Sequence, residues 1–229
     1  MTQRSSQSPR PILITGFGPF PGVPVNVSGV LAQAIGAAAG QMFPRARFEI
    51  AVLPTEWVAA PLLLEELMMR HRPEVALHFG VSNQARGFVV ETQARNIASH
   101  VDASGAAPIT DALFPNHSDA HAATLPAARI VQRLRRAGLP ATLSQDAGAY
   151  LCNAILFHSL RLGGGLASPA ASGFIHIPTR LPRRSAELTF DDAVRGGLEI
   201  VATALRRSPA PRRLMASAEA VAPGPQSRP

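Results

Sequence analysis

The chain has 229 residues, of which 46% are hydrophobic, and its only cysteine is Cys152. This length suits one domain with a sizeable core, and a lone cysteine excludes a disulfide within the chain. No stretch approaches the roughly 18 apolar residues that a membrane span needs, and the first residues are polar. We therefore expect a cytoplasmic protein without a signal peptide and without a membrane partner.

The net charge of +7 is concentrated near the two ends of the chain. Residues 1–10 contribute +2 and residues 206–229 contribute +4, which leaves +1 for the residues between them. A basic face that follows phosphate groups is not indicated within that part, so no nucleic-acid partner is expected. Both ends lack apolar periodicity. We predict disordered tails over 1–10 and 206–229 and a single α/β domain over 11–205.

Between the ends, short apolar runs alternate with stretches of helical pattern. In chain order, we predict a strand over 12–15, a helix over 28–39, a strand over 48–53, a helix over 57–70, strands over 75–79 and 88–96, a helix over 127–137, a strand over 141–143, a helix from near 148, a strand over 174–177 and a helix over 191–205. This alternation indicates an α/β fold: a single-domain, three-layer α/β/α sandwich with a largely parallel, twisted sheet.

Chemistry in such sheets gathers at the loops beyond the carboxyl ends of the strands. Four places there carry informative residues, namely the loop 16–26, the segment 80–91, the approach to Cys152, and His176 in the last predicted strand. Side chains that lie far apart in the sequence can converge at such an edge.

Cys152 lies where a polar, glycine-containing stretch changes to an apolar one. We predict that a helix begins near Gly148, with Asp146 or Ser144 as its N-cap. Cys152 would then lie in the first two turns, where the helix dipole favours a thiolate. A free cysteine is more often inert packing, so this stretch alone does not assign a nucleophile.

A thiol nucleophile needs a base, and the base needs an orienting partner, but spacing alone does not choose among the seven histidines. His158 lies six residues after Cys152, about 240° around a helix, and so faces elsewhere. His117 and His121 have a spacing that suits a metal on a helix, but no third ligand is apparent, and no metal is expected. His78 is expected to be packing.

Four short motifs carry more specific information. They are Ile-Thr-Gly-Phe-Gly-Pro-Phe-Pro-Gly (14–22) followed by Asn26; Pro-Glu-Val-Ala-Leu-His-Phe-Gly (73–80) followed by Glu91, Ala94 and Asn96; Asp-Ala-Gly-Ala-Tyr-Leu-Cys-Asn (146–153); and Ser-Gly-Phe-Ile-His-Ile-Pro (172–178). Over about residues 12–205 the chain resembles the pyroglutamyl peptidase type I (pyrrolidone carboxyl peptidase) family of cysteine exopeptidases, which have an α/β/α fold.

The resemblance implies a catalytic triad in which Cys152 is the nucleophile, His176 the base and acid, and Glu91 the orienter of His176. The implied reaction removes an N-terminal pyroglutamyl (5-oxoproline) residue from a peptide through a thioester, without a cofactor or metal. Substrate-binding positions are then Phe17, Phe20, Asn26 and Val81. Whether the protein forms a homo-oligomer is left open.

The chain departs from the family pattern around the implied pocket. Gly18 replaces the glutamate of the first family motif, and the loop after Gly80 lacks the family's Gly-rich form, with Arg86 one position late. Two other functions stay open: a catalytically weak relative that binds N-terminally blocked peptides or small lactams, and an interaction protein that acts through its arginine-rich tail.

Overall fold

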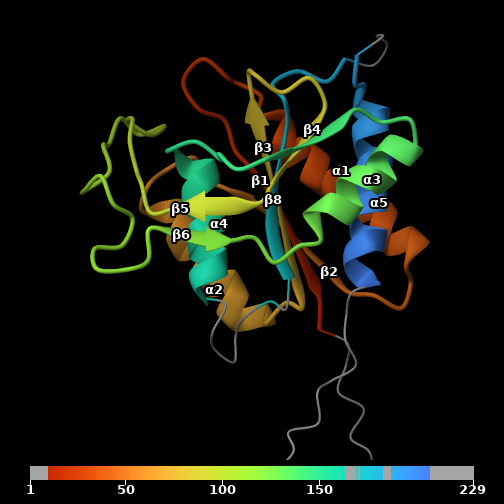
Figure 1. The fold of residues 1–229 in the computed structure, drawn as a ribbon, viewed down its shortest axis with the longest axis horizontal. Helices are drawn as coiled ribbons and strands as arrows, with labels where there is room; N and C mark the ends of the chain where they lie inside the picture. Colours follow the sequence, from red (N-terminus) through yellow and green to blue (C-terminus); the bar gives the residue numbers. More distant parts are fainter. Residues whose placement is uncertain (1–9, 163–168, 170, 183–186, 207–229) are drawn as a thin grey trace, which may run out of the picture.

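A six-stranded sheet forms the centre of the computed structural model, which describes residues 10–162, 169, 171–182 and 187–206 (Figure 1). The strands lie in the order β2-β1-β3-β8-β4-β7. Their bounds are β1 Ile12–Phe17, β2 Phe48–Leu53, β3 Val75–Ser82, β4 Phe88–Glu91, β7 Ala141–Ser144 and β8 Ala171–Pro178. All neighbours pair in parallel except β4 and β8, so β4 and β7 run opposite to the other four strands. The predicted, largely parallel sheet is confirmed.

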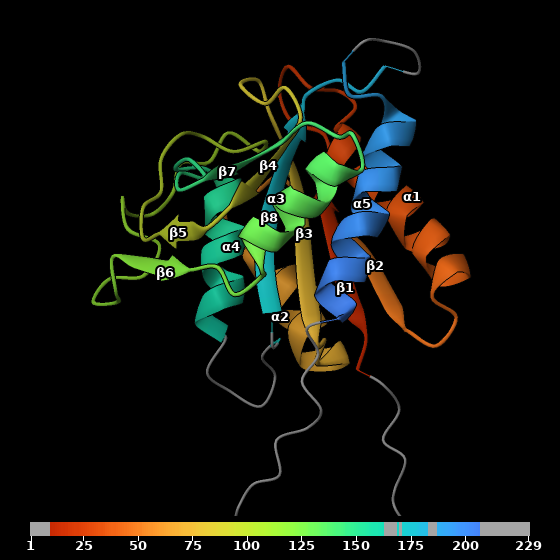
Figure 2. The ribbon, with the colours of Figure 1, turned by 45° about the vertical axis from the view of Figure 1, so that its right-hand side comes forward.

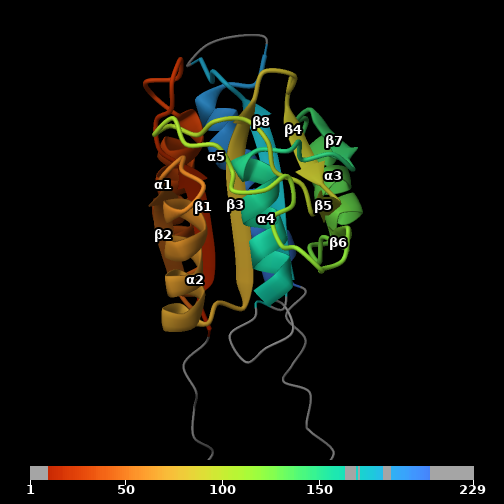
Figure 3. The ribbon, with the colours of Figure 1, turned by 90° about the vertical axis from the view of Figure 1, so that its left-hand side faces the viewer.

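Helices cover both faces of this sheet (Figures 1 and 3). One face carries α1 (Val27–Met42), α3 (Ala127–Arg136) and α5 (Phe190–Leu205), whose apolar side chains join the first core cluster. The other face carries α2 (Ala59–His71) and α4 (Leu151–Arg161), which join the second cluster. The fold is therefore the three-layer sandwich that the sequence predicts.

Side chains of the central strands alternate between the two faces, as the pleat requires. On β3, Leu77 and Phe79 pack against the layer of α1, α3 and α5, whereas His78 and Gly80 point toward α4. The α4 side of the sheet thus carries the buried polar residues of the main-sheet strands, which are Thr15, His78, Ser172, His176 and Glu91.

The predicted strand over 88–96 is wrong as a single element. It divides at Thr92 into β4 and β5 (Gln93–Arg95), and β5 pairs with β6 (Ala120–Ala122) in a separate two-stranded sheet beside α4 (Figure 2). Thr92 N and Thr92 Oγ1 each donate a hydrogen bond of 2.8 Å to Ser144 O. These two bonds hold the point at which the chain turns out of the main sheet. No element was predicted at the position of β6, because a three-residue strand has too few residues to show a period.

The predicted start of the Cys152 helix is also wrong. Helix α4 begins at Leu151 with Tyr150 as an N-cap that makes no side-chain capping bond. Ser144 and Asp146 instead shape the preceding turn: Asp146 Oδ1 accepts from Gly148 N at 3.0 Å, and Gly148 has a φ of 81°. That left-handed conformation ends the turn before the helix can begin, so Cys152 is the second helical residue.

The predicted tails lie outside the described residues apart from Arg10 and Arg206, the positions next to the domain. Arg10 is tied to the domain, since its guanidinium donates to the carbonyl oxygens of Arg72 and Pro73 at 2.7 and 3.0 Å. Within the described ranges, no helix is long and apolar enough to cross a membrane.

The connection from β1 to α1 depends on a close backbone approach at Gly16. A Cβ atom at this position would lie 2.2 Å from the carbonyl oxygen of Ser28, a backbone atom of α1 that cannot swing away. Asn26 caps α1 by accepting from Ser28 N at 3.2 Å, which holds that turn in place.

We therefore predict that Gly16→Ala lowers the free energy of unfolding by about 3 kcal/mol or more, because α1 must move off the sheet. Urea unfolding followed by circular dichroism measures the change. Gly40→Ala is the control: Gly40 lies in α1 itself with open space around its Cα, so alanine should raise the free energy of unfolding by about 0.5–1 kcal/mol. Equal effects of the two substitutions would contradict the close-approach explanation.

Candidate active site

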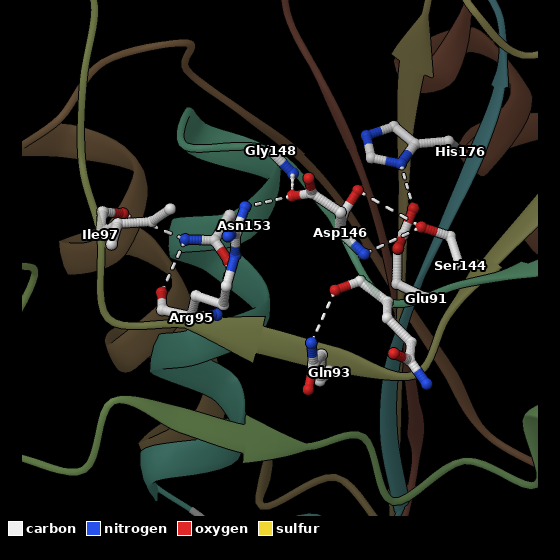
Figure 4. Close-up of polar contacts among 10 residues, drawn as sticks. Glu91, Gln93, Arg95, Ile97, Ser144, Asp146, Gly148, Asn153 and His176 are labelled. Carbon is white, nitrogen blue, oxygen red and sulfur yellow. Dashed lines mark hydrogen bonds and ion pairs between the residues drawn. The ribbon is translucent and has the colours of Figure 1, made fainter.

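His176 and Glu91 form a buried, hydrogen-bonded pair on neighbouring antiparallel strands (Figure 4). Val89 of β4 lies opposite His176 of β8, and Glu91 lies two residues further along β4, on the same face. Nδ1 of His176 is 2.8 Å from Oε1 of Glu91. Glu91 is 1% exposed and His176 8%, so water competes little for this contact.

Cys152 approaches the same place from α4, over Gly80 of β3. A Cβ atom added to Gly80 would lie 2.9 Å from Sγ of Cys152, closer than real Cβ atoms come. In the register of β3 and β8, Gly80 lies beside His176. Cys152 lies close enough to His176 for its charge and its side chain to raise the pKa of the imidazole. The absence of a side chain at residue 80 therefore allows the sulfur atom to reach the imidazole ring.

The surroundings of His176 favour its protonated form. Burial alone lowers the pKa of His176, but the negative charge of Cys152, the hydrogen bond to it, and the hydrogen bond and charge of Glu91 outweigh burial and raise the pKa to about 10. An imidazolium next to a thiol stabilises the thiolate. The protonated imidazole of His176 thus lies between the side chains of Cys152 and Glu91.

Asn153 fixes the first turn of α4 against β5. Its Oδ1 accepts from Arg95 N at 2.8 Å, and its Nδ2 donates to Arg95 O at 2.8 Å and Ile97 O at 3.1 Å (Figure 4). The side chain is fully buried. Arg95 also forms an ion pair of 2.5 Å with Asp146 in the turn before the helix. These contacts fix Asn153, the residue after Cys152, and the turn that precedes the helix.

A cavity of about 640 Å³ opens over the three residues. Its lining comprises Cys152, His176 and Glu91, the side chains Phe20, Val23, Val81, Val89, Tyr150 and Thr179, and residues 82–85, 144 and 146–148. Apolar side chains and the reacting groups therefore face the same space, which is the common composition of a small-ligand site.

The four predicted substrate-binding residues occupy different places. Phe20 and Val81 line the cavity. Phe17 is 3% exposed and packs on Phe174 with ring centroids 6.3 Å apart, and Asn26 is a buried cap whose Nδ2 donates to Gly18 O at 3.0 Å. Among the described residues that line the cavity, neither Phe17 nor Asn26 occurs. Both residues instead support the loop that carries Phe20.

Sequence reasoning missed three contributors, namely Gly80, Asn153 and Tyr150. Tyr150 lines the cavity and rests edge-on against Trp57, with ring centroids 5.5 Å apart. Gly80 and Asn153 lay within the quoted motifs, but nothing in the pattern showed which neighbours they meet. Tyr150 and Asn153 stand on either side of Leu151 and Cys152, and that position near the nucleophile was the available signal.

The remaining polar candidates lie away from these groups. His121 belongs to β6 and packs on Phe157, while His117 contacts Phe114, so the two histidines do not share a helix. Within the described part of the chain, no group of three or more His, Cys, Asp or Glu residues could hold a metal ion. Arg86 is exposed and donates to carbonyl oxygens of its own loop, Asn83 O and Ala85 O.

Comparisons with known proteins show which family this chain resembles. The family model described as pyroglutamyl peptidase matches residues 10–196. A pyrrolidone-carboxylate peptidase of Chromobacterium violaceum is 38% identical over 73% of this chain and 77% of its own length. Pyrrolidone-carboxylate peptidase 1 of Ralstonia nicotianae is 33% identical over 86% of this chain and 93% of its own.

Solved structures give the same result for the fold. A variant of pyrrolidone carboxyl peptidase from Pyrococcus furiosus matches with a TM-score of 0.78 and 26% identity, over 86% of this chain and 98% of that one. The Thermococcus litoralis pyrrolidone carboxyl peptidase matches with a TM-score of 0.73 and 27% identity, over 86% and 94%. By the match to the family model and by these relatives, the chain belongs to the pyroglutamyl peptidase family.

Proposed function

We propose that this protein is a cysteine-type omega peptidase that removes an N-terminal pyroglutamyl residue from peptides. Family membership supports the activity. The observation that carries the assignment of residues is the line of contacts from Glu91 through His176 to Cys152 at the floor of one cavity. In this proposal Cys152 is the nucleophile, His176 the acid and base, and Glu91 the orienting carboxylate.

The reaction proceeds in two halves. The Cys152 thiolate attacks the carbonyl carbon of the pyroglutamyl residue, and the imidazolium of His176 gives its proton to the leaving amine as the peptide bond breaks. The pyroglutamyl group is then a thioester on Cys152. Neutral His176 takes a proton from water, the resulting hydroxide attacks the thioester, and pyroglutamate leaves as the thiolate–imidazolium pair forms again.

The amino end of α4 supplies the charge stabilisation that acyl transfer needs. The first backbone N–H groups of a helix have no partner within it, and Cys152 is the second residue of α4. These groups and the helix dipole favour negative charge at the carbonyl oxygen next to the sulfur. Tyr150 caps the helix without a side-chain bond, so its side chain does not occupy them.

The charges of the cavity favour a substrate without an N-terminal ammonium group. Two carboxylates line it, and each already has a cationic partner: Glu91 holds His176, and Asp146 pairs with Arg95. An ordinary N-terminal amine would therefore find no free carboxylate among the described lining residues. A pyroglutamyl ring is neutral and flat, which suits a space bounded by Phe20, Val81 and Tyr150.

The alternative of a catalytically weak relative is not favoured, since the relatives are named pyrrolidone-carboxylate peptidases. An activated thiolate would be alkylated rapidly at pH 6, where an ordinary thiol is barely ionised. The alternative of a tail-mediated interaction protein concerns residues beyond the described part. A cytoplasmic location, where thiols stay reduced, and the lack of a nucleic-acid partner remain our proposals.

We predict that Cys152→Ala reduces hydrolysis of a fluorogenic pyroglutamyl amide by at least about 10³-fold, because no other thiol exists in the chain. Cys152→Ser should be nearly as inactive, because a hydroxyl is far harder to ionise. Urea unfolding should show both variants to be folded. Substantial turnover by either folded variant would remove Cys152 from the mechanism.

For Glu91→Gln, we expect turnover to fall by roughly 10- to 1,000-fold with little change in KM. The pH profile gives the sharper readout. The acid form of His176 is lost as pH rises through its pKa of about 10, so the alkaline limb of wild-type kcat/KM should lie there. Glu91 is one of the groups that raise this pKa, and its neutralisation should move the limb to lower pH. If Glu91→Gln changes neither the alkaline limb nor the turnover, Glu91 has no part in catalysis and the site is a Cys-His dyad.

Pyroglutamyl amides should be preferred over prolyl amides by at least about 10³-fold in kcat/KM. A prolyl substrate brings a charged amine and no lactam carbonyl, and unmatched buried groups of this kind cost roughly 4 kcal/mol together. Side-by-side assays of pyroglutamyl, prolyl and alanyl amides measure the ratio, and Phe20→Ala should raise KM for the first. Similar rates on all three amides would indicate a general aminopeptidase.

A further inference from the structure

A chain of buried polar side chains lies beneath the active site and uses none of the reacting groups. It begins on β1 with Thr15, whose Oγ1 is 2.8 Å from Nδ1 of His78 on β3. Nε2 of His78 is 3.0 Å from Oγ of Ser159 on α4. Oγ of Ser159 is in turn 2.5 Å from Oγ of Ser172 on β8. None of the four is more than 1% exposed.

This row of side chains differs from ordinary apolar packing, because hydrogen bonds join its members. Burial lowers the pKa of His78 to about 3, so the ring is neutral and has one N–H donor and one acceptor nitrogen. Hydroxyl groups on both sides can serve either role, so both ring nitrogens have partners. A hydrogen bond restricts distance and angle far more narrowly than a contact between two aliphatic side chains does.

The contacts between β3 and α4 place this row of hydrogen-bonded side chains in register with Cys152. His78 and Gly80 are two residues apart on β3 and point to the same face of the sheet. Cys152 and Ser159 are seven residues apart on α4, two turns, and lie on the same side of the helix. Gly80 meets Cys152, and His78 meets Ser159. The helix is therefore held on β3 at two points along its length.

The neighbouring strand makes this register matter for the reaction. In the pairing of β3 with β8, Gly80 lies beside His176 and His78 beside Phe174. A sliding or turning of α4 over β3 would change the distance from Sγ of Cys152 to the imidazole of His176. Displacements of about 1 Å at a reacting pair can cost around 100-fold in rate.

We propose that His78, through its bond to Ser159, is a positioning residue that sets the register of α4 on the sheet and hence the contact between Cys152 and His176. This inference deepens the proposed function and rests on it for its catalytic readout. Neither His78 nor Ser159 lines the cavity among the described residues, so neither touches the substrate. Their effect passes through the position of the thiol.

The test compares Ser159→Ala with Thr203→Val as a matched control. Thr203 is also a buried helical hydroxyl, 2% exposed, and its Oγ1 donates to Glu199 O at 2.7 Å on α5, across the sheet from the active site. Ser159 bonds two buried side chains and Thr203 one backbone carbonyl oxygen, so Ser159→Ala should lose more stability than Thr203→Val. Urea unfolding establishes that loss, and all assays are run at a temperature where every protein is fully folded.

Two readouts follow for wild type, Ser159→Ala and Thr203→Val. The first is kcat and KM on a pyroglutamyl amide, and the second is the rate of alkylation of Cys152 by iodoacetamide at pH 6. We expect Ser159→Ala to lower kcat by roughly 10- to 100-fold with KM within about twofold, and to slow alkylation by roughly 10-fold. Thr203→Val should match the wild type in both.

Wild-type values of kcat and alkylation rate in folded Ser159→Ala would overturn the proposal. So would an equal loss of both in Thr203→Val, because the effect would then follow stability and not position. Alkylation needs no substrate. A wild type that does not cleave pyroglutamyl amides would therefore contradict the proposed function alone, while the alkylation rates would still decide the positioning role.

Discussion

The close approach of α4 to β3 at Gly80 is the constraint on which the active site depends. Any side chain there would meet the ring of Phe174 at 2.5 Å and the sulfur of Cys152 at 2.9 Å. Without that side chain, the first turn of the helix comes within reach of the strand next to His176. The bonds of Asn153 to the backbone of β5 then fix where the turn begins. A sulfur on a helix thereby meets an imidazole on a strand.

The reacting groups are held in an arrangement that favours reactivity at a cost in stability. Among the described residues, the buried Oε2 atom of Glu91 has no hydrogen-bond partner, while its Oε1 holds His176. A half-satisfied buried carboxylate is unfavourable unless a nearby positive charge compensates it. That charge is the imidazolium, whose own protonation depends on Cys152 and Glu91. Cys152 and Glu91 thus both favour the protonated form of His176, and removal of either would lower the pKa of this histidine.

The sequence predicted most elements and the general class of the fold, and β2 agrees to the residue because Pro54 follows it. It could not predict that β4 runs antiparallel to β8, since strand direction depends on partners far away in the chain. Glu91 and His176 are 85 residues apart, and their pairing came from family resemblance and not from spacing. His78 was interpreted as packing, because its partners Thr15 and Ser159 lie on two other elements.

The two faces of the sheet differ in composition, because the buried polar side chains lie on the α4 face. On the side of α1, α3 and α5, the central strands present aliphatic and aromatic residues to one large core. On the side of α4, the same strands combine the apolar Leu13, Ala76 and Phe174 with the polar Thr15, His78 and His176. Because side chains alternate along a strand, every polar residue on the α4 side has apolar neighbours in sequence that pack on the other. Burial of the apolar side chains on one face thus offsets the free-energy cost of desolvating the polar side chains on the other.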